Sequence, residues 1–390
     1  MYSQLLGLVP EPNARVDWAN LVEQIPSLAE LDRCPQDAYW HAEGDVGVHT
    51  RMVCDEMVAL PGYAAATPER RFVLFYSALL HDISKPAVTK TEDGRITSKG
   101  HSLRGATDAR ILLWRHEVPF ELRESICRMI RVHQDPFMIV TRKANPEFVV
   151  RKLSHEMNLE ELSLVAEADA RGRRTNPASV WQETLDAIEL FRELAREQNC
   201  YTQPYPMADA HTAVTYFRQG PTAEMDPRYP MFQEAGSKVI VLSGLPAAGK
   251  DTWVAENGKD LPVISFDDAR EELGLKHGKN AGAAVHLAQD RAKELLRAKK
   301  PFIWNATHLS QQMRDKTLDM LYAYGAEVEI IYLEQPANVL FSRNDKRDST
   351  LPNKVLETML FKWEVPLPTE VHAIRYEVPQ PATKSRLRLR

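Results

Sequence analysis

The stretch Val239-Ile-Val-Leu-Ser-Gly244-Leu-Pro-Ala-Ala-Gly249-Lys250-Asp251-Thr252 decides the fold of the second half of the chain. Its β-branched start predicts a buried strand, and the glycine-spaced turn that follows opens a helix. The two glycines allow a tight path on which several backbone N–H groups point inward, where they can hold phosphate oxygens. Lys250 can then reach the β- and γ-phosphates. The alternative is a glycine turn with a solvated lysine.

We therefore predict that this loop binds ATP or another NTP together with Mg²⁺. The nucleotide-binding residues expected are Gly244, Leu245, Pro246, Ala247, Ala248, Gly249, Lys250, Asp251 and Thr252. The position after the lysine is normally Ser or Thr, whose hydroxyl contacts magnesium. Here it is Asp251, and a carboxylate is also a good ligand for a hard cation. Either Asp251 or Thr252 can serve the metal.

The pattern around this loop predicts an α/β domain with a parallel sheet, because strands alternate with helices. A nucleotide then belongs at the carboxyl ends of the strands. Strands are expected at 238–243, 262–266, 302–305 and 328–333, with a weaker one at 371–378. Helices are expected at 252–255, 267–273, 281–298, 310–324, 336–345 and 353–364.

The first half of the chain has the three- and four-residue apolar spacing of helices. Such stretches occupy 53–60, 72–80, 106–114, 122–132, 162–168 and 180–194. Prolines interrupt the pattern between 201 and 236. We predict an all-α helical bundle at 1–200, a Pro-rich connection at 201–236 with a short helix near 213–217, and the α/β domain at 237–390.

Composition excludes several classes of protein. No apolar run approaches the ~20 residues that a membrane span needs, so no membrane partner is expected. The beginning, Met1-Tyr-Ser-Gln, has no basic stretch typical of a secretory signal. Four widely spaced cysteines form no C-x-x-C pair and favour a reducing, cytoplasmic location. Because the net charge is −5, any contact with nucleic acid requires a local basic groove.

Two acids follow the second predicted strand of the α/β domain, in Ser265-Phe-Asp267-Asp268-Ala-Arg270. At that place they face the γ-phosphate site, where one carboxylate can accept the proton of an attacking hydroxyl. Arg270, one helical turn beyond Asp267, can hold a phosphate of the acceptor. The alternative is that Asp267 or Asp268 merely caps the helix.

A charged run, Ser342-Arg343-Asn-Asp-Lys-Arg347-Asp-Ser349, follows the fourth predicted strand. Arg343 and Arg347 are four residues apart, so they share a helix face or lie at the end of the helix. Guanidinium groups over a transferring phosphoryl group stabilise its spread charge. We interpret the run as a helical lid; the alternative is a solvated, salt-bridged helix.

At these residues the chain resembles the polynucleotide 5'-kinase branch of P-loop phosphotransferases. The resemblance covers 238–378 and rests on the phosphate loop, Asp-Asp-Ala-Arg, Asn305-Ala-Thr307-His308 and the arginine-rich lid. It implies that Asp267 is the general base, that Arg270 binds the phosphate 3' to the attacking 5'-hydroxyl, and that Arg343 and Arg347 assist phosphoryl transfer beside Lys250.

Histidines and acids in the helical half recur in the order H…HD…H…H…D. Imidazoles and carboxylates collected from several helices form a metal site, and two ions a few Å apart can activate water and hold a phosphoester. The candidate ligands are His49, His81, Asp82, His101, His133 and Asp169. Lys85 is a candidate for binding substrate phosphate, or is simply exposed.

That order resembles the HD superfamily of metal-dependent phosphohydrolases. The resemblance implies a first metal on His49, His81, Asp82 and Asp169, and a second on His101 and His133 with Asp82 bridging. One or two divalent transition metals (Mn, Ni, Co or Fe) are expected, since such sites accept several.

The order of the two domains resembles the bacterial HD-Pnk end-healing enzymes over nearly the whole chain. It implies phosphorylation of 5'-OH ends of RNA or DNA and hydrolysis of 2',3'-cyclic phosphate or 2'-phosphate ends, which then suit a downstream ligase. Two alternatives stay open. One is a small-molecule or nucleoside kinase fused to an HD nucleotidase, and the other is a kinase with a non-catalytic HD module for nucleotide sensing or RNA docking.

Overall fold

The computed structural model describes residues 2–142, 145–275, 281–346 and 351–379. The chain divides into two units, and the boundary between them in the sequence falls between Tyr205 and Pro206. Most of the predicted connection therefore lies within the second unit. There it forms helix α13 (Ala210–Gln219) and the short 3-10 helix η2 (Gly220–Thr222). Asp209 caps α13 by accepting a hydrogen bond from the Thr212 N–H at 2.7 Å.

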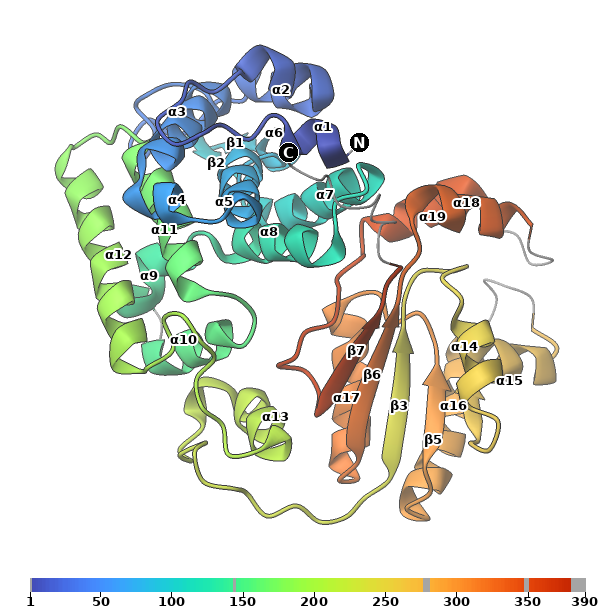
Figure 1. The fold of residues 1–390 in the computed structure, drawn as a ribbon. Coiled ribbons are helices and arrows are strands. Elements are labelled where there is room, and N and C mark those ends of the chain that lie inside the picture. The colour runs from blue at the N-terminus through green and yellow to red at the C-terminus, as the bar shows by residue number, and fades with distance from the viewer. Residues whose placement is uncertain (1, 143–144, 276–280, 347–350, 380–390) are drawn as a thin grey trace, which may run out of the picture. The chain divides into compact units, whose positions relative to one another are not determined.

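The first unit is helical, as predicted (Figure 1). Its elements are α1 (Tyr2–Leu6), α2 (Trp18–Gln24), η1 (Pro26–Arg33), α3 (Val46–Ala59), α4 (Pro61–Ala65), α5 (Pro68–Leu80), α6 (Lys85–Val88), α7 (His101–Arg115), α8 (Phe120–Val132), α9 (Asp135–Arg142), α10 (Pro146–Ser154), α11 (Leu159–Arg171) and α12 (Ser179–Glu197), with two short strands, β1 (Lys90–Glu92) and β2 (Arg95–Thr97).

Helix α5 lies at the centre of this unit. Thr67 caps it and Pro68 occupies its first turn, which is where proline is best tolerated. All nine residues from Phe72 to Leu80 are buried. A helix that is apolar all round must be surrounded by others, and α3, α8 and α11 all pack on α5. The buried helix delivers the following His81-Asp82 pair into the interior.

Helices α3 and α11 approach each other closely at Gly172. A Cβ added to Gly172 would lie 2.8 Å from the backbone nitrogen of Val53, so this position accepts no side chain without a shift. The close approach brings the carboxyl-terminal turn of α11 beside the middle of α3.

The hairpin β1–β2 was not predicted. Its strands are three residues long, antiparallel and largely exposed, so they carry no apolar alternation. The turn between them is Asp93-Gly94, with φ angles of 51° and 73°. That dipeptide is a typical signal of a two-residue hairpin turn.

The second unit contains a five-stranded sheet in the order β4-β5-β3-β6-β7, in which every pairing is parallel. Its elements from β3 onward are β3 (Lys238–Ser243), α14 (Lys250–Asn257), β4 (Val263–Ser265), α15 (Phe266–Glu272), α16 (Ala281–Arg297), β5 (Phe302–Asn305), α17 (Gln311–Ala323), β6 (Glu327–Leu333), α18 (Ala337–Asp345), α19 (Asn353–Leu360) and β7 (Ala373–Glu377). The predicted α/β fold is confirmed. Its last strand, β7, corresponds to the weaker strand expected at 371–378.

The phosphate loop follows the central strand β3, whose pairing with β6 runs from Lys238 to Ser243. Helices α18 and α19 lie at the end of the sheet toward which the strand arrows point in Figure 1. The loop and the predicted lid therefore share the carboxyl end of the sheet.

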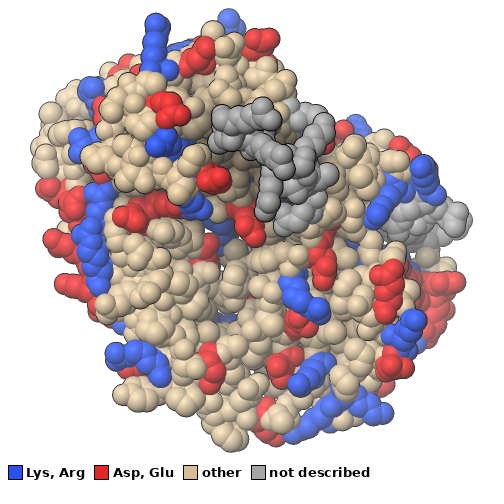
Figure 2. Space-filling model, viewed as in Figure 1, with Lys and Arg blue, Asp and Glu red and all other residues tan. Residues whose placement is uncertain are grey.

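Surface charge agrees with the small net charge of the chain. On the face shown in Figure 2, basic and acidic side chains of the described residues are interspersed. Within the described ranges, the structure contains no helix with the length and hydropathy of a membrane span.

Buried His308 gives the second unit a pH-dependent stability. The Nδ1–H of His308 donates to the Leu242 carbonyl at 2.8 Å, and Nε2 lies 3.1 Å from the Thr317 hydroxyl. Burial lowers the pKa of His308 from 6.5 to about 4. The unfolded chain thus takes up a proton near pH 6.5 that the folded unit resists until about pH 4. Stability is full above pH 6.5 and falls as the pH drops through this window, by roughly 1.4 kcal/mol per pH unit at most.

We expect His308→Gln to flatten this dependence, although it lowers stability at neutral pH. Urea unfolding between pH 4 and 7.5, followed by tryptophan fluorescence, measures both effects. A wild-type stability that stays level across the window, or a variant with an unchanged slope, contradicts the assignment.

Candidate metal centre and phosphate loop

All six candidate metal ligands come together in the interior of the first unit. They are supplied by different elements: His49 by α3, His81 and Asp82 by the end of α5, His101 by the start of α7, His133 by the end of α8, and Asp169 by α11. Each is buried. Six polar side chains from five helical elements thus converge where a structural core would hold apolar ones.

Asp82 lies between two groups of ligand atoms. One group is His49, His81 and Asp169, and the other is Asp82, His101 and His133; within each, the ligand atoms lie within 4.8 Å of one another. Asp82 Oδ2 is 3.1 Å from His81 Nε2, and Asp82 Oδ1 is 3.4 Å from His101 Nε2. Its two oxygens therefore face different groups, as the predicted bridging role requires.

A backbone carbonyl lies beside Nδ1 of all four imidazoles, and for His49 it is that of Gly172, at 3.3 Å. Nδ1 of His81, His101 and His133 lies 2.7, 2.8 and 2.8 Å from the carbonyls of Ala78, Ser98 and Ile130. A carbonyl only accepts, so each Nδ1 carries a proton and Nε2 is the nitrogen left for a metal. The tautomer protonated at Nδ1 is the one that binds a metal through Nε2. Burial opposes the charge of His81, but Asp82 outweighs it and raises the pKa of His81, so a metal that binds there displaces a proton from Nε2.

Burial and neighbouring charges give the ligands different protonation. Burial lowers the pKa of His133 to about 3 and also lowers that of His101, which keeps both rings neutral. Burial opposes the charge of Asp82, but His81 and Lys85 outweigh it and hold the pKa of Asp82 well below its usual range. Burial likewise opposes the charge of Asp169, and Arg173 outweighs it. Neutral imidazoles and ionised carboxylates are the forms that coordinate metals.

The donor set fits divalent transition metals. Oδ1 of Asp82 is buried and has no hydrogen-bond partner among the described residues. An ionised oxygen left in that state is costly unless a cation balances it. Four imidazoles with two carboxylates are ligands that Mn, Fe, Co and Ni accept.

Sequence reasoning missed two residues that hold the ligands in place. Glu43 Oε1 lies 3.0 Å from His49 Nδ1, and its Oε2 accepts from the Arg174 N–H at 2.8 Å. Arg173 pairs with both oxygens of Asp169, at 2.9 and 2.6 Å. Neither residue belongs to the H…HD…H…H…D order, although Arg173 lies only four residues after the candidate ligand Asp169.

Lys85 points at the ligand cluster. Its Nζ lies 2.7 Å from Asp82 Oδ2 and 2.8 Å from Gln36 Oε1, and the residue is buried. This excludes the interpretation that Lys85 is simply exposed.

In the second unit, the backbone of the phosphate loop has the expected shape. Gly244 and Gly249 have φ angles of 151° and 107°, and a Cβ at Gly244 would lie 2.3 Å from the Leu333 carbonyl oxygen. Lys250 Nζ donates to the carbonyls of Gly244 and Leu245 at 3.0 and 2.9 Å. The loop closes around its own lysine.

Asp251 is tied to the third strand of the domain. Its Oδ1 accepts a hydrogen bond from Asn305 Nδ2 at 2.8 Å, while Thr252 is exposed. Both residues line a cavity of about 1360 Å³ next to the phosphate loop.

Asp267 is not the cap of α15. Ser265 fills that role by accepting from the N–H groups of Asp267 and Asp268. The side chain of Asp267 is 76% exposed and pairs with Arg270, and both line the 1360 Å³ cavity. The alternative interpretation of Asp267 as a capping residue is therefore excluded.

Arg343 on α18 lies next to the phosphate loop. A Cβ added to Gly249 would be 3.5 Å from the Nη1 atom of Arg343. Lys346, which was not predicted, lines the same cavity. Arg347, the second predicted lid arginine, lies outside the described residues.

Comparison with known proteins identifies both domains. A family model described as an HD domain matches residues 46–173, and one described as an AAA domain matches residues 239–366. The chain thus carries an HD domain over 46–173. A P-loop domain of the AAA type follows it over 239–366, which confirms the domain order expected from the HD-Pnk resemblance.

Among curated relatives, a multifunctional CCA protein of Ralstonia nicotianae is 26% identical over 60% of this chain and 48% of its own length. An L-seryl-tRNA(Sec) kinase of Methanococcus maripaludis is 27% identical over 33% of this chain and 53% of its own length. The chain thus spans about half of each. A solved gluconokinase from Sinorhizobium meliloti, 21% identical, aligns over 38% of this chain and 86% of its own with a TM-score of 0.28.

Replacing Glu43 tests its hold on His49. We expect Glu43→Ala to weaken binding of added Mn²⁺ by about 10- to 100-fold, the usual effect of removing a group that orients a metal ligand. Competition with a chelator measures the affinity. Glu30→Ala, at an exposed position, is the matched control. Equal affinity in the Glu43 variant and the wild type would show that His49 needs no such support.

Proposed function

We propose that the protein is a bifunctional nucleic-acid end-healing enzyme. Its P-loop domain transfers the γ-phosphate of an NTP to 5'-OH ends of RNA or DNA, and its HD domain hydrolyses 2',3'-cyclic phosphate and 2'-phosphate ends. Healed ends of this kind suit a downstream ligase. The observation that carries the kinase half is the joint placement of the phosphate loop, Asp267 and Arg270 around one large cavity.

The cavity size favours an extended acceptor. Pockets for small molecules usually measure about 300–1,000 Å³, and this cavity measures about 1360 Å³. An NTP leaves room beside Asp267 and Arg270, and the exposure of Asp267 admits a strand end. The relative named as an L-seryl-tRNA(Sec) kinase supports a hydroxyl that is carried by RNA.

In the kinase reaction the acceptor hydroxyl attacks the γ-phosphorus, an O–P bond forms, and the nucleoside diphosphate leaves. Asp267 accepts the proton of that hydroxyl, and Arg270 holds the adjacent phosphate of the strand. Lys250 and Arg343 face the developing charge from the loop and from α18. Bound Mg²⁺ would screen the phosphates, with Asp251 or Thr252 in reach of it.

In the HD domain the six ligands would hold one or two divalent metals, which when bound lower the pKa of a water and polarise the phosphoester. Side chains of the protein itself bind the substrate and hold the ligands in place. Lys85 offers its ammonium group to a phosphate oxygen at the edge of the cluster. Arg173 keeps Asp169 ionised and fixed. Ordered imidazoles on four helical elements keep the site rigid.

The kinase half is tested with labelled ATP, Mg²⁺ and a 5'-OH oligonucleotide. We expect label transfer that falls by about 100-fold or more in Lys250→Ala and Asp267→Asn, since each removes a group acting in the transition state. Asp268→Asn, which removes the neighbouring charge, is the control and retains transfer. Labelling of free nucleosides without labelling of oligonucleotides would show a small-molecule kinase instead.

The HD half is tested on RNA ending in a 2',3'-cyclic phosphate, with added Mn²⁺, Ni²⁺, Co²⁺ or Fe²⁺. We expect His81→Ala and Asp82→Asn to abolish phosphoester hydrolysis and to leave oligonucleotide labelling intact, because the phosphate loop belongs to the other unit. His116→Ala, outside the ligand cluster, is the control. A wild-type protein that binds RNA but hydrolyses no such end with any of the four metals would favour the docking-module alternative.

A further inference from the structure

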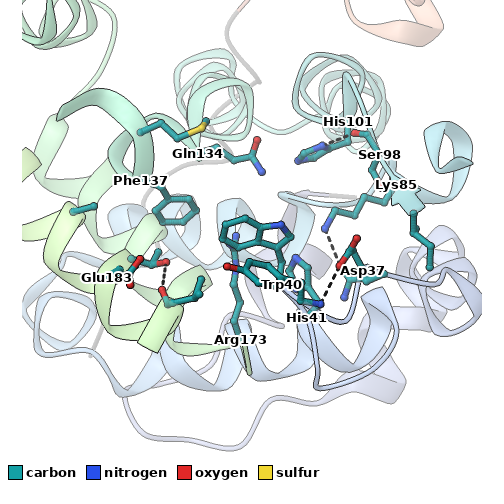
Figure 3. A pocket seen from close by; sticks show the side chains of 17 residues that line it. Asp37, Trp40, His41, Lys85, Ser98, His101, Gln134, Phe137, Arg173 and Glu183 are labelled. Carbon is teal, nitrogen blue, oxygen red and sulfur yellow. Dashed lines mark hydrogen bonds between the residues drawn. The ribbon is translucent and has the colours of Figure 1, made fainter. Parts of the chain in front are cut away.

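A second cavity, of about 490 Å³, lies beside the metal-ligand cluster in the first unit (Figure 3). His101 and Lys85 line it, so it is continuous with the cluster. Its other walls come from residues 36–41, from α9 and from α12. The function proposed above uses the cluster but leaves this cavity without an occupant.

Aromatic rings line the cavity away from the ligands. Trp40 is 42% exposed, and its ring is nearly perpendicular to that of its neighbour Tyr39, with ring centroids 4.8 Å apart. Phe137 is covered by the guanidinium group of Arg173 at 4.8 Å, and that arginine is itself fixed by Asp169. A large exposed indole in a concave site next to a reaction centre is a surface on which a flat ring can stack.

Polar groups stand at the boundary between the rings and the cluster. Nε2 of Gln36 is buried and has no hydrogen-bond partner among the described residues, while Oε1 of the same amide accepts from Lys85. A buried donor without an acceptor is costly, so this amide is suited to an oxygen of a bound molecule. Gln134, which Figure 3 shows at the cavity, adds an amide able both to donate and to accept.

We propose that this cavity binds the nucleobase of the terminal nucleotide, stacked on Trp40, while Gln36 and Lys85 hold oxygens of its ribose phosphate. The proposal rests on the phosphoesterase function proposed above and narrows its substrates to phosphoesters that carry a base. A free sugar phosphate leaves the rings unused, and a volume of about 490 Å³ suits one nucleoside. Lys85 and the buried Nε2 of Gln36 would bind the phosphate end of the nucleotide. The ring of Trp40 would bind its base.

The test compares adenosine 2',3'-cyclic phosphate with 1-O-methylribose 2',3'-cyclic phosphate, which lacks the base. We expect a KM for the nucleotide that is lower by about tenfold or more, within the range for one stacked base. Trp40→Leu should raise the KM for the nucleotide by a similar factor with little change in kcat, and should leave the base-free compound unaffected. Trp40→Phe should restore most of the difference, which a purely structural role of the ring would not predict.

Trp18→Leu, which removes an indole outside the cavity, is the matched control, and thermal unfolding verifies that each variant is folded. Equal KM values for the two compounds in the wild type, or an equal effect of Trp40→Leu on both, overturns the proposal. If neither compound is hydrolysed, the proposed phosphoesterase function is wrong. A binding measurement then still tests whether the cavity holds a nucleobase. Calorimetry with adenosine 2'-monophosphate should show binding that Trp40→Leu weakens by about tenfold; no binding by the wild type overturns the proposal.

Discussion

The helical unit depends on the burial of two ionised carboxylates, Asp82 and Asp169, at the place where five helical elements meet. A buried charge is destabilising unless partners surround it. Arg173 and His49 satisfy Asp169, while Lys85 and His81 satisfy part of Asp82. The architecture follows from this requirement, because α5 is buried on all sides to deliver Asp82, and Gly172 lets α11 approach α3 closely enough for Asp169 to meet His49. One oxygen of Asp82 is left over, and it is the oxygen that faces the second group of ligands.

The second unit presents the opposite arrangement, since its charged side chains gather at a surface cavity beside the phosphate loop. The backbone of the phosphate loop and side chains at strand ends line this cavity. In a parallel sheet all carboxyl ends share one edge, so Asp251, Asp267, Asn305 and Arg343 reach the same cavity although they come from four segments. Ser265 caps α15 and thereby frees both following acids for other contacts.

Much of this could be predicted from the sequence, and the reason differs between the parts. The phosphate loop and the strands around it are local patterns, and their positions agree with the structure. The six candidate metal ligands could also be named from the sequence, because the pattern of residue types is itself distinctive, and the structure brings these six side chains together. Glu43, Arg173 and Gln36 were not predicted. Glu43 and Arg173 hold candidate ligands only six and four residues away in the sequence, but neither stands in the H…HD…H…H…D order. Gln36 acts through one buried amide. Hairpin β1–β2 was missed because its exposed strands lack alternation, although Asp93-Gly94 marks the turn.

Lys250 donates to two carbonyl oxygens of its own loop. The lysine therefore acts as an internal competitor of the nucleotide, because the phosphates must take its ammonium group from acceptors that are already in place. Part of the intrinsic affinity is lost in that exchange. In return, these two hydrogen bonds give the loop a defined shape before any phosphate enters it.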